Sequence, residues 1–146
     1  MCRDRPHVLA RVALFTLAAV VLTSATGCGR LDQDSVATEL RTLQSSTAEG
    51  MLVADEAARA RAAADFIEIR TAELSKQSGD AAETLDETPT EAGLQRAAGR
   101  GSEIGNRASE ILDELHGNPD DKSLARNVAT ELHSLHDEAG RIEESL

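Results

Sequence analysis

Two histidines near the end of the chain have the spacing of metal ligands. His133 and His136 are three residues apart, so on a helix they share one face, with Asp137 beside them. Imidazole nitrogens and carboxylates are the groups that bind zinc in proteins. Glu103 falls opposite them across the preceding turn and is a candidate third ligand. The alternative, which we favour, is that both histidines flank the apolar stripe of their helix and are solvated or ion-paired.

No other set of residues has the spacing of a catalytic or cofactor site. The glycines at positions 99, 101 and 105 do not follow a predicted strand and do not match Gly-x-Gly-x-x-Gly, so a nucleotide loop is not indicated. The sequence also lacks the Ser–His pattern of a triad and the Glu-x-x-His pairs of a di-metal bundle. We therefore predict a protein that is not an enzyme and has no cofactor.

The charge balance excludes one class of partner. The chain has 15 basic and 26 acidic residues, for a net charge of −11. Loss of residues 1–27 would remove Arg3, Arg5, Arg11 and Asp4, leaving 12 basic and 25 acidic residues and a net charge of −13. Such a surface repels a phosphate backbone, so we expect no nucleic acid partner.

The first 27 residues have the composition of an export signal. Arg3, Arg5 and Arg11 make a positive start, and an apolar run of 14 residues follows from Val12 to Ala25. This run is shorter than the roughly 20 residues needed to span a bilayer as a helix. The alternative is an uncleaved anchor from about Val8 to Thr26, in which Arg11 would be costly.

The four residues Ala25-Thr26-Gly27-Cys28 resemble the lipobox that ends the signal peptide of bacterial lipoproteins. Ala25 departs from the pattern, which usually has Leu three positions before the cysteine. The resemblance implies a cleaved signal peptide (1–27), a diacylglyceryl group on Cys28, a short lipidated tether (28–34) and a domain over 35–146. It also implies a protein held by its lipid on the extracytoplasmic face of the cell membrane.

The chain beyond residue 34 has the periodicity of helices that pack on one another. Three runs place apolar or small residues at alternating steps of three and four, from Val53 to Leu74, from Leu94 to Leu115 and from Leu124 to Leu146. We therefore predict an all-α fold, an antiparallel helical bundle of three long helices over 51–78, 89–116 and 119–145. Residues 35–49 make either a shorter N-terminal helix or the start of a continuous helix of about 65 Å with 51–78.

Capping residues predict where the helices begin and end. Thr88-Pro89 and Asn118-Pro119 have the order of an N-cap followed by proline at the first helical position. Gly79 and Gly117 are placed where a left-handed residue would end the preceding helix. The second and third long helices are then antiparallel neighbours joined by a tight turn at Gly117-Asn118.

The small residues of the second run suggest where a partner binds. The chosen face consists of Ala97, Gly101, Ile104, Gly105 and Ala108, although close packing within the bundle also accounts for its glycines. We predict a non-catalytic interaction bundle at the cell envelope that binds another envelope protein or itself. The alternatives are an extracytoplasmic metal- or small-ligand-binding protein that uses His133 and His136, and a structural envelope spacer.

Overall fold

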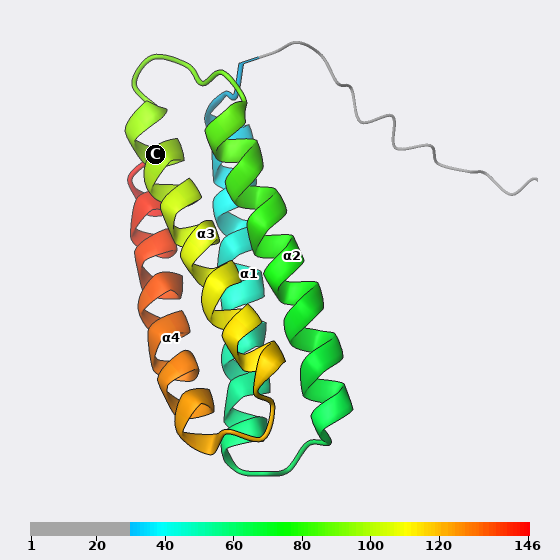
Figure 1. Cartoon of the computed structure of the whole chain (residues 1–146). Helices are drawn as coiled ribbons and strands as arrows, with labels where there is room; N and C mark the ends of the chain where they lie inside the picture. The colour runs from blue at the N-terminus through cyan, green and yellow to red at the C-terminus, as the bar shows by residue number, and fades with distance from the viewer. Residues whose placement is uncertain (1–29) are drawn as a thin grey trace, which may run out of the picture.

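The computed structural model describes residues 30–146, which form four α-helices in an antiparallel bundle (Figure 1). The helices are α1 (Gln33–Ala58), α2 (Ala64–Glu87), α3 (Gln95–Gly117) and α4 (Lys122–Glu144). Each packs on its neighbours in the sequence, α1 also packs on α4, and α2 and α4 occupy opposite corners. The predicted all-α antiparallel bundle is therefore confirmed. The predicted signal peptide and the predicted lipid attachment site, Cys28, lie outside the described residues.

The predicted helix over 51–78 is wrong, because the chain turns back on itself at residues 59–63. Residues 35–58 belong to one helix, α1, and the second half of the predicted helix starts α2. Neither the predicted separate helix over 35–49 nor the predicted continuous helix of about 65 Å is present. The apolar run misled because its spacing continues across the turn, so Val53 and Ile67 are both buried although they lie on different helices.

Gly50 and the hydroxyl residues before it do not interrupt α1. A Cβ atom at Gly50 would lie 2.8 Å from Leu132 Cδ1 and 3.2 Å from Leu112 Cδ2, so glycine here allows close packing. Ser46 and Thr47 are buried, and each hydroxyl donates to the carbonyl oxygen of Leu43 (3.1 and 2.7 Å). Because these hydroxyls are satisfied within the helix, burying them carries no cost of an unpaired polar group.

Several predicted boundaries also shift. Gly79 lies inside α2, Pro89 lies in the loop before α3, and Pro119 lies in the turn before α4. Asp121 rather than Asn118 caps α4, because its carboxylate accepts from the backbone N–H groups of Leu124 (3.0 Å) and Ser123 (2.9 Å). These hydrogen bonds lower the pKa of Asp121. Gly117 ends α3 as a helical residue, and among residues 30–146 only Ala60 and Gly93 have positive φ.

The domain begins earlier than residue 35. Leu31 is buried, its N–H donates to the carbonyl oxygen of Pro89 (2.7 Å), and its own carbonyl oxygen accepts from the N–H of Glu91 (3.1 Å). The last residues of the predicted tether therefore belong to the folded domain. This contact also fixes the start of the domain against the α2–α3 loop, at the end of the bundle that we call the near end (Figure 1).

The core has two apolar clusters, one at the near end and one at the far end, where the 59–63 and 118–121 turns lie. Leu40, Leu43 and Leu85 belong to the near cluster, and Leu74, Leu112 and Leu132 to the far one. Between them, the hydroxyl groups of Ser46 and Ser78 are 2.9 Å apart and fully buried. No helix within residues 30–146 is both long and apolar enough to cross a membrane.

Candidate functional site

The candidate metal ligands are not brought together. His133 is exposed, and its Nε2 lies 3.6 Å from a carboxylate oxygen of Asp137 on the same helix. His136 is half-buried, and its Nδ1 is 3.0 Å from the carbonyl oxygen of Gln44, which can only accept, so Nδ1 carries the proton. The carboxylate of Glu103 instead pairs with Arg100 at 2.6 Å. In the part of the chain that the structure describes, no three His, Cys, Asp or Glu side chains lie close enough to hold a metal ion.

The face chosen for partner binding is occupied by the chain itself. Gly101, Ile104, Gly105 and Ala108 are buried, and Ala97 is half-buried. In the folded bundle α1 and α2 cover Gly101 and Gly105, and Ala97 lies in a cleft between α3 and α4. The close-packing explanation holds for both central glycines, as their surroundings show.

The surroundings of Gly105 and Gly101 differ in rigidity. A Cβ atom at Gly105 would lie 2.7 Å from the backbone carbonyl oxygen of Ser78 and 2.8 Å from Cβ of Ala82. A Cβ atom at Gly101 would lie 2.7 Å from Leu85 Cδ1 and 3.1 Å from Leu40 Cδ2, which are ends of flexible side chains. The missing side chains are therefore what allows α3 to approach α1 and α2.

Three large apolar side chains instead lie on the surface, and we call them the apolar patch. Leu52 on α1 is 68% exposed, and Phe66 and Ile69 on α2 are 48% and 60% exposed. No other large apolar side chain within residues 30–146 is exposed. Isolated exposed apolar residues are ordinary, whereas several together often mark an interaction site.

The register of α1 against α2 places these three residues at similar heights, toward the far end of the two helices. Arg70 on α2 forms an ion pair with Glu49 on α1 and with Glu73 on its own helix. Leu52 lies three residues beyond Glu49 toward the turn, and Ile69 lies one residue beyond Arg70 in the same direction. The two side chains are therefore at nearly the same height, because antiparallel helices rise equally per residue. Phe66 lies one turn closer to the 59–63 turn.

A polar groove continues from the apolar patch toward the near end, between the same two helices. Its volume is about 380 Å³, and its charged lining residues are Glu39, Glu73, Asp80 and Lys76. Lys76 is paired with Asp80. Burial raises the pKa of Glu39, whose carboxylate has no ion-pair partner among the described residues. We call this feature the α1–α2 groove.

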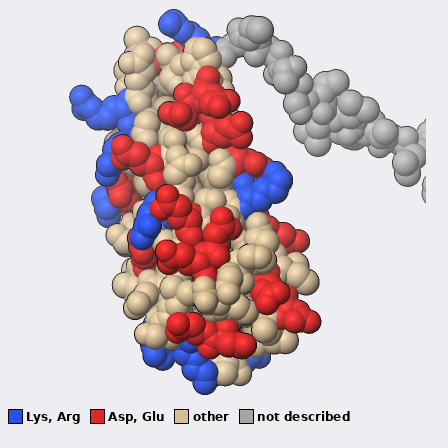
Figure 2. All heavy atoms as spheres, viewed as in Figure 1, with Lys and Arg blue, Asp and Glu red and all other residues tan. Residues whose placement is uncertain are grey.

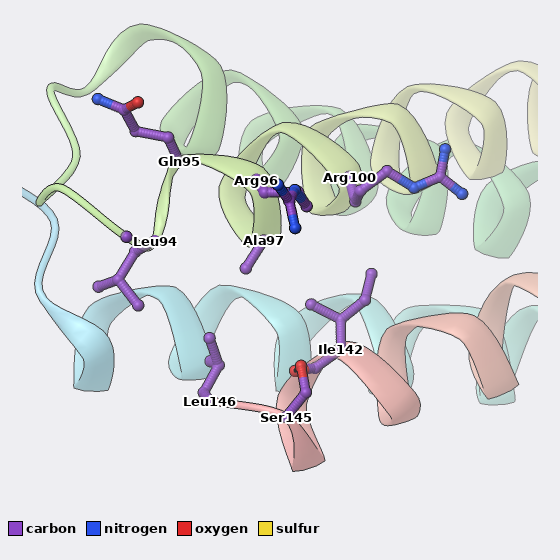
Figure 3. Close-up of a pocket in the computed structure, with 9 residues that line it drawn as sticks. Leu94, Gln95, Arg96, Ala97, Arg100, Ile142, Ser145 and Leu146 are labelled. Carbon is purple, nitrogen blue, oxygen red and sulfur yellow. Dashed lines mark hydrogen bonds between the residues drawn. The ribbon is translucent and has the colours of Figure 1, made fainter.

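A wider cleft of about 580 Å³ lies at the near end, between the start of α3 and the end of α4. Figure 3 shows Ala97 on α3 facing Ile142 on α4 across it, with Leu94 and Leu146 at one side. Arg96 and Arg100 follow along α3. Arg100 is already paired with Glu103 and Glu138. The lining contains no His, Cys, Asp or Glu side chain, so the cleft offers no side-chain carboxylate, imidazole or thiol for acid–base or nucleophilic chemistry.

The sequence interpretation missed the apolar patch. Leu52, Phe66 and Ile69 fall outside the buried stripe that runs through Val53, Ala57, Ile67 and Leu74. Large apolar residues that do not fit a helix's own stripe were the signal that was present in the sequence. Comparison with known proteins adds no relative: the chain matches no family model, no curated protein and no solved structure.

Proposed function

We propose that this protein is an exported lipoprotein whose helical bundle binds another protein of the cell envelope and does no catalysis. The leader with Arg3, Arg5 and Arg11, the apolar run and the Ala25-Thr26-Gly27-Cys28 sequence support export and lipid attachment. Two or more acyl chains would be needed for stable anchoring, since one chain holds a protein only marginally.

The observation that carries the binding role is the apolar patch. Burying an exposed Leu, Ile or Phe side chain against a partner contributes about 1.5–3 kcal/mol each before the costs of association. Leu52 and Ile69 are each more than half exposed, although the bundle has buried most of its other large apolar residues. A surface of this kind favours protein binding over ligand or metal handling.

The position of Cys28 relative to the domain determines how the patch would be presented. Only two residues, Gly29 and Arg30, lie between Cys28 and Leu31, which is held by Pro89 and Glu91. The three steps from Cys28 to Leu31 span about 10 Å when extended. A lipid on Cys28 would therefore hold the near end at the membrane. Leu52 lies 20 residues along α1 from Asp32, or about 30 Å along the helix. The patch would then face partners beyond the membrane surface.

Lipid anchoring is tested by Cys28→Ser in the full chain. We expect the variant to move from the membrane fraction to the soluble fraction and to lose labelling by a fatty acid analogue. Cys2→Ser is the matched control, because Cys2 lies in the leader and would be removed with it. Unchanged membrane partition of Cys28→Ser would contradict the anchoring proposal.

Partner binding is tested by site-specific photo-crosslinking in the native membrane. A photo-reactive residue at Ile69 should give one defined adduct, identifiable by mass spectrometry. The same residue at Thr130, which is exposed on α4, is the control and should not give that adduct. Identical adducts from both positions, or none from Ile69, would overturn the binding role of the patch.

A further inference from the structure

We propose that the apolar patch and the α1–α2 groove together form a docking site for one amphipathic helix of a partner protein, apolar at one end and basic at the other. This inference rests on the proposed binding role and names the chemistry of the partner.

The patch and the groove are consecutive along one face. On α2, Phe66, Ile69, Glu73 and Asp80 follow one another at steps of three, four and seven residues, so they lie on a single stripe. On α1, Thr42 lines the groove and Glu49, seven residues further on, pairs with Arg70, whereas Leu52 lies one turn beyond Glu49 on the outer side of the helix. Two antiparallel helices bordering a furrow present the kind of groove in which a third helix lies.

The character of this face changes along its length. Its far end is apolar, with Leu52, Ile69 and Phe66. Toward the near end the groove has three carboxylates, of Glu39, Glu73 and Asp80. Glu73 is paired with Arg70 and Asp80 with Lys76, so the carboxylate that a partner's cation would newly pair is that of Glu39. From Ile69 to Asp80 the distance along α2 is about 16 Å. A complementary helix therefore needs apolar residues one turn apart and Lys or Arg about eleven residues away.

The charge of this face favours one kind of partner over the others. Residues 30–146 include 12 basic and 25 acidic residues, and Figure 2 shows groups of acidic side chains from one end of the face in view to the other. A second copy of this chain, or an anionic bilayer, would bring like charges together. A basic helix would instead supply a cation to Glu39, a partly buried carboxylate whose pKa is raised and which has no ion-pair partner among the described residues. The complementary partner is therefore basic.

The test uses the full chain in detergent and a synthetic 18-residue helical peptide with Leu residues at one end and Lys residues at the other. A control peptide has the same composition with the two residue types mixed along the helix. Fluorescence anisotropy should show at least tenfold tighter binding of the ordered peptide. Equal affinities would overturn the proposal, since they would reflect charge alone.

Matched variants locate the binding. Leu52→Gln with Ile69→Gln should weaken binding of the ordered peptide at least tenfold, and Thr130→Gln should leave it unchanged. Asp80→Asn should weaken binding about threefold and reduce its dependence on salt. Binding that is unaffected by the Leu52 and Ile69 substitutions would place the peptide elsewhere and overturn the docking site.

Two further measurements separate the competing explanations. Sedimentation of the wild-type chain should show a monomer. A dimer that is lost in the Leu52→Gln and Ile69→Gln double variant would assign the face to a second copy and overturn the proposal. If the ordered peptide fails to bind while Ile69 still crosslinks a defined partner, the binding role stands and the basic helix is wrong. If the photo-reactive residue at Ile69 also crosslinks nothing, both the binding role of the patch and the basic-helix proposal are wrong.

Discussion

The α3 face around Gly101 and Gly105 and the apolar patch on α1 and α2 are opposites in one molecule. The first is built of small residues and is completely covered by α1 and α2. The second is built of large apolar residues and is open to solvent. Small residues allow the closest approach of two backbones but bury little area each, whereas large apolar residues gain most from a partner. In this bundle the small residues therefore serve the fold, and the large exposed ones are left for binding.

Of the variants that test this comparison, Gly101→Leu should lose the most stability. Even a Cβ atom at this position would lie 2.7 Å from Leu85 Cδ1, so a whole leucine side chain has no space between α3, α2 and α1. We expect the free energy of unfolding to fall by about 3 kcal/mol or more. Urea unfolding followed by circular dichroism measures it. A stable, fully helical variant would show that this face is open after all.

Gly105→Ala should destabilise through the backbone. The added methyl group would lie 2.7 Å from the carbonyl oxygen of Ser78, so α2 and α3 must move apart. We expect a loss of about 2 kcal/mol in the free energy of unfolding, despite the better helix propensity of alanine. The same unfolding experiment checks this value. A gain in stability would mean that the α2–α3 contact is looser than described.

Gly99→Ala is the matched control on the same helix and should have the opposite sign. Apart from the neighbouring backbone of α3 itself, no atom lies within 4 Å of a Cβ at this position. We expect the free energy of unfolding to rise by about 0.5–1 kcal/mol, because alanine restricts the unfolded chain and favours helix. A thermal melt suffices to detect the change. Destabilisation here would indicate that all glycines of α3 respond alike, and the comparison would lose its basis.

Leu52→Gln with Ile69→Gln should have the smallest effect on stability. Both side chains are mostly exposed, so their replacement removes little packing, and we expect a change within about 0.5 kcal/mol for each substitution. Urea unfolding of the double variant gives the measurement. A loss of several kcal/mol would reveal that these side chains support the fold, and the patch would then no longer be a surface reserved for a partner.

The sequence predicted burial better than it predicted connectivity. Gly101, Ile104, Ala108, Ile111 and Leu115 were assigned to one stripe and are all buried. The turn at residues 59–63 was missed, because the stripe of α1 and that of α2 continue one another in spacing. The turn also lacks a glycine or proline signal; Ala60 takes the left-handed conformation at φ 51°. Alanine in that position is uncommon, so the residue types gave no warning.

The candidate sites, like the connectivity, depend on contacts between helices that spacing along the chain does not predict. Periodicity places His133 and His136 on one face, but only packing shows that the ring nitrogen of His136 donates to Gln44 and that Glu103 pairs with Arg100. The α1–α2 groove required the register between the two helices, which is set by contacts such as those of Arg70 with Glu49 and Ser46 with Ser78. No spacing along one helix contains that information.

The sequence by itself determined that the chain is helical, that its helices pack through defined stripes and that its surface is acidic. These properties depend on residues near one another in the chain, and the 3.6-residue repeat reports them directly. Only the tertiary structure decided which helix covers each stripe, and therefore which apolar residues remain outside. That choice depends on contacts between distant residues: α1 and α2 cover Gly101 and Gly105 of α3, whereas Leu52, Phe66 and Ile69 stay about half or more exposed.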